Sequence, residues 1–300
     1  MPSEPGSLEP AALADRHALL RAAAALIPGD TPRLDAELLL AYAMGEARLE
    51  MLLGSAPVPA DVRMRFAALV ARRRTHQPVA YITGEREFWS LSLKVSPAVL
   101  LPRPDSETLV AEAVARRSKT PPGMILDLGT GSGALLLAAL SQWPAAFGVG
   151  VDRSAAALCV AQANATALGF GDRACFLVGD WAGALDARFD LILCNPPYIP
   201  DDTPLMPDVA LHEPASALFG GADGLDPYRI LFPKLAGLLA PGGLALFEFG
   251  QGQAGQLLEL AAAAGLDAQI AHDLAQRPRA VVLTVPAIAP IGLGKPPGSV

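Results

Sequence analysis

The sequence predicts an α/β fold: a doubly wound, mostly parallel sheet that follows a small N-terminal helical domain and a β-hairpin linker. Apolar residues recur with helical period up to about residue 74, and they alternate between residues 80 and 96. Beyond residue 123, short apolar strands alternate with helical segments. We therefore divide the chain into a loose tail (1–10), a helical domain (11–78), a hairpin linker (79–96), an α/β domain (97–285) and a second loose tail (286–300).

The composition favours a cytoplasmic protein without a membrane span. Of the 300 residues, 52% are apolar and 18% are charged, yet no apolar run approaches the roughly 20 residues that a bilayer requires. The N-terminus, MPSEPGSLEP, lacks the basic and apolar regions of a secretory signal. Cys159, Cys175 and Cys194 are distant from one another, which favours reduced, buried thiols over disulfides or a metal site.

The net charge of -7 argues against a general affinity for DNA, which requires a strongly basic face. One segment, ARRRTHQ (71–77), departs from this balance. Its cations, Arg72 to Arg74, either complement the dipole at a helix C-terminus or form a docking patch for a partner. Both interpretations stay open.

The N-terminal helical domain contains two clear helical patterns. The first, LDAELLLAYAMG, ends at Gly45 as a C-cap and has one apolar face, made of Leu34, Leu38, Leu39 and Tyr42. Pro59 opens the second, ADVRMRFAALVARRR. The segment AYITGEREFWSLSLKVS then alternates, which predicts the hairpin, and PRPDSETLVAEAVARR predicts a further helix.

Five strands of the α/β domain are predicted from the runs MILDLG, FGVGVD, CFLVGD, DLILCN and LALFEFG. The intervening helices begin near Gly133, Ser154, Leu225 and Gln251, and PRAVVLTV adds a strand of uncertain direction. Parallel sheets of this kind bind ligands at the carboxyl ends of their strands.

A glycine-rich turn, DLGTGSG, follows the first strand. Gly129, Gly131 and Gly133 allow positive φ and bring backbone N–H groups close to a ligand. Asp152 ends the second strand, where a carboxylate can accept both hydroxyls of a ribose. The turn and the acid together predict a nucleoside cofactor.

A second motif, Asn195-Pro-Pro-Tyr198, follows the fourth strand. The Asn195 side-chain oxygen and the Pro196 carbonyl can accept both N–H groups of a planar amide or amine, which orients its nitrogen towards an electrophile. Tyr198 can stack on that planar group. Such a site needs no strong base and no covalent nucleophile, because the rate comes from orientation.

These motifs resemble those of S-adenosylmethionine-dependent amino-methyltransferases, and the fuller pattern is similar to the HemK/PrmC family of release factor glutamine-N5 methyltransferases. The resemblance runs from about residue 34 to residue 285. It is carried by QPVAYITGEREFWSLSLKVSPAVLLPRPDSE, DLGTGSGA, GDWAGAL, DLILCNPPYI, HEPASALFGGADGLDPYR and LAPGGLALFEFGQGQ. It implies a Rossmann-like class I methyltransferase domain that uses S-adenosylmethionine, releases S-adenosylhomocysteine and needs no metal.

The resemblance also implies roles for individual residues. The cofactor would be bound by Gly129, Thr130, Gly131, Ser132, Gly133, Asp152, Trp181 and Asn195, with Trp181 beside the adenine. Asn195, Pro196, Pro197 and Tyr198 would take the glutamine of the Gly-Gly-Gln motif in class I peptide chain release factors. Arg103 and Glu107 would order the site, and the helical domain and hairpin would dock the protein substrate, which is bound by a monomer.

Two positions depart from the family pattern. Cys194 stands where the family usually has Ser, and we expect a buried thiol of no consequence. Gln276 stands where Gly is common and could alter a turn.

Four other functions remain as alternatives. The substrate could be a glutamine of a ribosomal protein, or a flipped adenine in DNA, which the acidic charge disfavours. A nicotinamide oxidoreductase would leave Asn195-Pro-Pro-Tyr198 without a role, and a non-enzymatic binding module would not need an intact acceptor motif.

Overall fold

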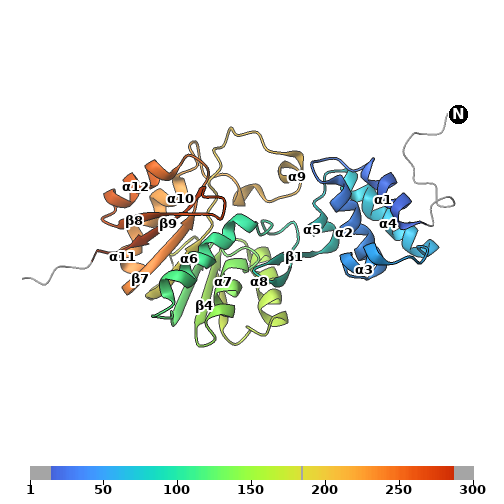
Figure 1. The fold of residues 1–300 in the computed structure, drawn as a ribbon. Helices are drawn as coiled ribbons and strands as arrows, with labels where there is room; N and C mark the ends of the chain where they lie inside the picture. The colour runs from blue at the N-terminus through green and yellow to red at the C-terminus, as the bar shows by residue number, and fades with distance from the viewer. Residues whose placement is uncertain (1–14, 184, 287–300) are drawn as a thin grey trace, which may run out of the picture.

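The computed structural model describes residues 15–183 and 185–286, which form a helical domain joined to a larger α/β domain (Figure 1). Both tails predicted from the sequence lie almost entirely outside these residues. The helical domain contains α1 (Arg16–Ala24), α2 (Pro32–Met44), α3 (Arg48–Leu53), α4 (Ala60–Arg74) and α5 (Val79–Thr83). Its core is built around Leu20, Leu40, Met51 and Phe66. No helix among the described residues is both long and apolar enough to cross a bilayer.

The apolar face predicted for α2 is wrong in three of its four residues. Leu39 is buried, but Leu34, Leu38 and Tyr42 are 40%, 36% and 53% exposed. This helix is apolar nearly all round, so periodicity alone does not select the packed side. The side that packs carries Ala36, Leu40 and Ala43, and small alanines let neighbouring helices approach closely. The predicted C-cap is confirmed, since Gly45 has a left-handed φ of 70°.

The hairpin is shorter than the sequence pattern predicts. Its strands are β1 (Glu85–Phe88) and β2 (Leu91–Lys94), joined by Trp89 and Ser90, which both have positive φ. The segment Val79–Thr83, predicted as part of the hairpin, is the helix α5. Pro78 precedes its first turn and Gly84 ends it with a φ of 82°, and this pair of terminating residues outweighs the alternation.

The α/β domain is a seven-stranded sheet in the order β5-β4-β3-β6-β7-β9-β8. The five predicted strands are confirmed as the parallel part: β3 (Met124–Leu128), β4 (Phe147–Asp152), β5 (Ala174–Val178), β6 (Phe189–Cys194) and β7 (Leu239–Glu248). The predicted last strand is β9 (Pro278–Thr284), antiparallel to β7. The edge strand β8 (Asp267–His272) escaped sequence analysis because its side chains are mostly polar or small.

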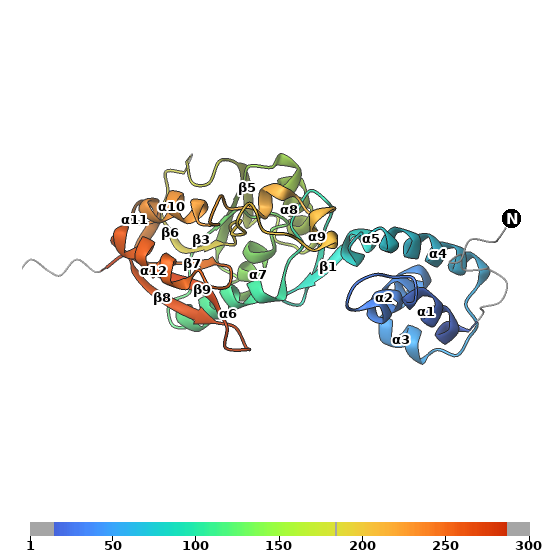
Figure 2. The same ribbon diagram turned by 90° about the horizontal axis from the view of Figure 1, so that it is seen from above.

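Helices cover both faces of this sheet (Figure 2). On one face α6 (Glu107–Arg117) packs against β7, β8 and β9, and α7 (Ala134–Gln142) packs against β3, β4 and β6. On the other, α10 (Asp226–Leu231), α11 (Leu235–Leu238) and α12 (Ala254–Ala263) bury an aromatic core that includes Tyr228, Phe232 and Phe247. The helix α8 (Ala155–Ala167) flanks β5 and β4. Strand-helix alternation therefore predicted the layers correctly.

The cysteines and the turn at Gln276 refine two expectations. The prediction of buried thiols is confirmed for Cys194 and is wrong for Cys159 and Cys175, which are exposed because each lies on the outward side of its helix or strand. The turn between β8 and β9 places Gln276 at a φ of 60°. A left-handed backbone favours glycine, so this departure from the family pattern leaves a strained residue in the turn.

The basic segment 71–77 places Arg72 to Arg74 in the last turn of α4, which confirms the interpretation of cations at a helix C-terminus, and it also connects the two domains. Arg73 is buried and forms ion pairs of 2.7 Å with Asp35 in the helical domain and with Asp208 on α9 (Pro207–Ala210). His76 Nδ1 lies 2.9 Å from Asp208 Oδ1, and His212 Nε2 lies 2.9 Å from the Thr75 carbonyl. Figures 1 and 2 both show α9 beside the helical domain. The loop that follows β6 is thereby tied to the end of α4.

Candidate active site

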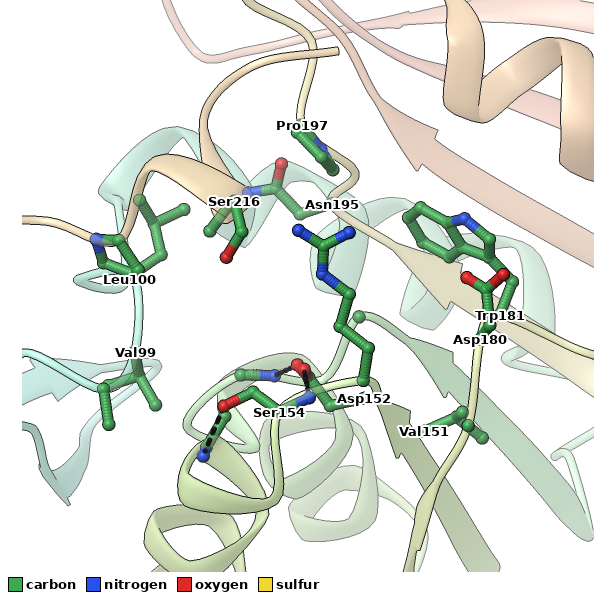
Figure 3. Close-up of a pocket in the computed structure, with 18 residues that line it drawn as sticks. Val99, Leu100, Val151, Asp152, Ser154, Asp180, Trp181, Asn195, Pro197 and Ser216 are labelled. Carbon is green, nitrogen blue, oxygen red and sulfur yellow. Dashed lines mark hydrogen bonds between the residues drawn. The ribbon is translucent and has the colours of Figure 1, made fainter.

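A cavity of about 300 Å³ opens at the carboxyl ends of β3, β4 and β5 (Figure 3). We call it the first cavity. Three strand-end loops line it, and they contribute Gly129, Gly131, Asp152, Ser154, Asp180 and Trp181. Val99 and Leu100 close it on one side, and Asn195 and Pro197 close it on another. The position agrees with the ligand edge expected for a parallel sheet.

The glycine-rich turn divides into residues that face the first cavity and residues that support it. Gly129 and Gly131 line the cavity with φ of 72° and 54°. Thr130 and Ser132 are buried and do not line it; the Thr130 hydroxyl donates to Asp127 at 2.7 Å. At Gly133, a Cβ would approach Ala161 and Leu137 to 3.3 Å, so this glycine serves helix packing.

Asp152 braces the loops and still faces the first cavity. Its Oδ2 accepts a hydrogen bond from the Gly131 N–H and its Oδ1 accepts one from the Ser154 N–H, both at 2.9 Å. Each carboxylate oxygen keeps a further lone pair for a ligand hydroxyl. Trp181 lies across the cavity beside Asp180 (Figure 3), and its ring passes close to Gly129. An acid, an aromatic ring and open glycine backbone together fit a nucleoside.

A second cavity, of about 260 Å³, adjoins the first. Both are lined by Leu100, Asn195 and Ala217, so Asn195 stands where they meet. Pro196, Tyr198 and Arg103 also line the second cavity, and its other walls are mostly apolar: Ile199, Pro204, Leu205, Met206, Val209 and Leu218. An apolar chamber with a few polar groups at one end suits a planar side chain that enters from outside.

The side-chain amide of Asn195 is held in one orientation. Its Nδ2 donates to Ser106 Oγ at 3.0 Å, which leaves the carbonyl oxygen to accept hydrogen bonds. The Tyr198 hydroxyl donates to Glu248 Oε1 at 3.2 Å. The acceptor groups predicted from Asn195-Pro-Pro-Tyr198 are therefore brought together beside the first cavity.

Of the two residues expected to order the site, only Arg103 lies in it. Arg103 lines the second cavity and forms an ion pair with Glu213, whose carboxylate is buried and also accepts from the Leu101 N–H. Glu107 instead accepts a hydrogen bond from the Trp89 N–H at 2.9 Å and thereby holds the hairpin turn. It lines neither cavity.

Sequence reasoning missed Ser106, Glu213 and Glu248. Ser106 belongs to the PRPDSE segment that was singled out, and Glu248 is a charged residue at the carboxyl end of a predicted strand. Glu248 could have been found from the sequence, because a carboxyl in an otherwise apolar strand must have a partner or be neutral. Among the described residues, no cluster of three or more histidine, cysteine or acidic side chains could hold a metal ion.

Comparison with known proteins agrees with both domains. The PrmC N-terminal domain family matches residues 17–84, and the methyltransferase domain family matches residues 120–221. The solved structure of the hMettl16 catalytic domain in complex with MAT2A 3'UTR hairpin 6 has a TM-score of 0.54 at 14% identity. It covers 71% of this chain and 84% of that one, a likeness of fold alone.

Two curated relatives span nearly the whole molecule. The release factor glutamine methyltransferase of Rhodospirillum rubrum is 45% identical over 266 residues, which cover 87% of this chain and 82% of the relative. That of Moorella thermoacetica is 42% identical over 272 residues, 88% of this chain and 96% of the relative. The chain therefore belongs to the family of release factor glutamine methyltransferases.

Proposed function

We propose that this chain transfers a methyl group from S-adenosylmethionine to the side-chain nitrogen N5 of a glutamine, in the Gly-Gly-Gln motif of class I peptide chain release factors. One observation carries the proposal. Asn195, its amide oriented by Ser106, stands where a nucleoside-sized cavity meets a second cavity that opens beside Tyr198. The site thus has separate places for a methyl donor and a planar acceptor.

The cofactor of the family is S-adenosylmethionine, and the first cavity fits it. Asp152 would accept the ribose hydroxyls, Trp181 would lie beside the adenine, and the open backbone at Gly129 and Gly131 would face the methionyl part. Bound there, S-adenosylmethionine supplies a methyl group on a positively charged sulfur, which leaves as a neutral thioether.

The acceptor chemistry depends on the chain's own groups. The Asn195 side-chain oxygen and the Pro196 carbonyl would accept the two N–H groups of the glutamine amide, which turns its nitrogen towards the first cavity. Tyr198 would cover the amide plane and exclude water. The nitrogen gains the methyl group and releases one proton to solvent. Because an N-alkylated amide cation is strongly acidic, no strong base is required, and orientation supplies the rate.

We assign the docking of the release factor to the helical domain (11–78) and the hairpin. Leu34, Leu38 and Tyr42 form an exposed stripe on α2, an apolar surface that no other part of the described chain covers. The ion pair of Asp208 with Arg73 and its contact with His76 connect this domain to the loop that lines the second cavity. Cytoplasmic location and a monomeric state stay predictions from the sequence.

The test is incubation with labelled S-adenosylmethionine and purified release factor, followed by mass mapping of the methyl group. We expect one methyl group on the Gly-Gly-Gln glutamine and none on a release factor whose glutamine is replaced by alanine. Ribosomal proteins and DNA serve as competing acceptors in parallel reactions. Preferential labelling of either, or equal labelling of the alanine variant, would show that the proposed substrate is wrong.

A further inference from the structure

Glu248 is a buried carboxyl directly behind the acceptor motif. It ends β7, is 2% exposed, and its Oε1 accepts the hydrogen bond from the Tyr198 hydroxyl at 3.2 Å. Its main-chain carbonyl accepts a hydrogen bond from the Tyr228 hydroxyl at 2.7 Å. Its Oε2 is buried and has no hydrogen-bond partner among the described residues. A group this costly to bury calls for a role beyond packing.

Ser106, a buried neighbour of the same carboxyl, holds the other half of the acceptor site. This serine is 4% exposed, and its Oγ accepts the hydrogen bond from Asn195 Nδ2 at 3.0 Å. It also lies near enough to Glu248 to lower the pKa of that carboxyl, as does the Tyr198 hydroxyl. Glu248 therefore holds Tyr198, while Ser106, which lies beside it, holds Asn195.

We propose that Glu248 and Ser106 are positioning residues for methyl transfer, and that together they hold the Asn195 amide and the Tyr198 ring in the geometry that receives the glutamine. The inference rests on the proposed function and deepens it. If Asn195 lost its bond to Ser106, its amide could rotate and present N–H groups, which cannot accept the substrate's N–H. If Tyr198 lost its bond to Glu248, the ring could tilt away from the amide plane.

The carboxyl is suited to this task in its neutral form. Burial raises the pKa of Glu248 to about 7, against the lowering by Ser106 and Tyr198, and nearby Asp105 raises it further. A neutral acid still accepts the hydroxyl of Tyr198 without adding charge beside the acceptor amide. Glutamine has the same shape as the neutral acid and keeps a carbonyl acceptor, whereas leucine fills the space without one.

The test compares Glu248→Gln, Glu248→Leu and Ser106→Ala by steady-state kinetics with release factor. Glu248→Gln should keep kcat within about threefold. Glu248→Leu and Ser106→Ala should lower kcat by about 10- to 100-fold, the scale of a misplacement near 1 Å. In all three, calorimetry should show an unchanged Kd for S-adenosylmethionine, because the first cavity is not lined by either residue.

The matched control is Tyr228→Phe, which removes the hydrogen bond to the main-chain carbonyl of the same Glu248. It should reduce thermal stability slightly and leave kcat unchanged. A kcat within twofold of wild type for Ser106→Ala, or a Glu248→Gln variant as slow as Glu248→Leu, would overturn the inference; Ser106→Ala decides it even if the leucine variant fails to fold. Labelling of release factor by the wild type, run alongside, tests the proposed function separately.

Discussion

The two cavities share Asn195 but are built in different ways. Three short strand-end loops of one sheet line most of the first, and the Asp152 carboxylate braces two of them through backbone N–H groups; residues 98–100, 195–197 and 214–217 close it. The second draws on segments 100–103, 195–199, 204–209 and 217–218, and one of these is tied to the helical domain through Asp208. Both cavities are therefore lined by the α/β domain, but the wall of the second includes a loop that is held by the helical domain.

The largest expected effect is on the acceptor side. Asn195→Ala removes the oriented carbonyl and should lower kcat about 10²- to 10³-fold, the cost of one lost transition-state hydrogen bond. The Kd for S-adenosylmethionine should change little, because Asp152 and the loop glycines remain. Single-turnover methylation and calorimetry on the same sample would check both, and wild-type turnover would refute the role of Asn195.

The reciprocal change is on the donor side. Asp152→Ala should weaken S-adenosylmethionine binding by about 1.5–3 kcal/mol, because it removes charged acceptors for the ribose and unties the Gly131 and Ser154 backbone groups. At saturating S-adenosylmethionine, kcat should recover towards wild type, unlike that of Asn195→Ala. Isothermal titration supplies the affinity. Unchanged binding would mean that this carboxylate only supports the turn.

Each cavity has a buried carboxyl behind it, and these should make stability depend on pH. Burial raises the pKa of Asp127, under the glycine-rich turn, to about 7, like that of Glu248. Such a group remains protonated in the folded chain while the unfolded chain releases its proton. The contribution of each buried carboxyl to the free energy of unfolding is therefore complete below the ordinary pKa near 4 and is lost as pH rises through 7.

We expect Asp127→Asn to reduce the fall in unfolding free energy between pH 5 and pH 8 by on the order of 2 kcal/mol. Denaturant unfolding of wild type, Asp127→Asn and Glu248→Gln at both pH values measures how steeply the unfolding free energy falls with pH. Asp127→Asn reports on the carboxyl behind the first cavity, and Glu248→Gln reports on the carboxyl behind the second. Parallel slopes for wild type and both variants would show that neither carboxyl holds its proton in the folded state.

The smallest expected effect tests the connection between the domains. Asp208→Asn removes the charge that pairs with Arg73 and His76, and it should raise KM for release factor about fivefold, the worth of roughly 1 kcal/mol. S-adenosylmethionine affinity should not change. The matched control is Asp61→Asn. It breaks an exposed ion pair with Arg65 on α4, the helix that also carries Arg73. Equal KM values for the two variants would show that the acceptor loop does not need this tie.

Local patterns in the sequence determined the layers of the α/β domain and the position of its ligand edge. Short continuous apolar runs that alternate with helical segments identify the buried strands, and carboxyl ends of parallel strands converge on one edge. Gly129, Gly131, Asp152, Trp181 and Asn195 could be placed together for that reason. Their signals are short motifs at strand ends, which the structure brings to the first cavity.

Contacts between distant segments were decided only by the tertiary structure. Ser106 meets Asn195 across 89 positions, Tyr198 meets Glu248 across 50, and Arg73 pairs with Asp208 in the other domain. Periodicity does not contain these pairs, because it reports which face of an element is apolar and not which element packs there. On α2, where nearly every face is apolar, even the buried side was fixed by packing against neighbouring helices, and only that packing exposed Leu34, Leu38 and Tyr42.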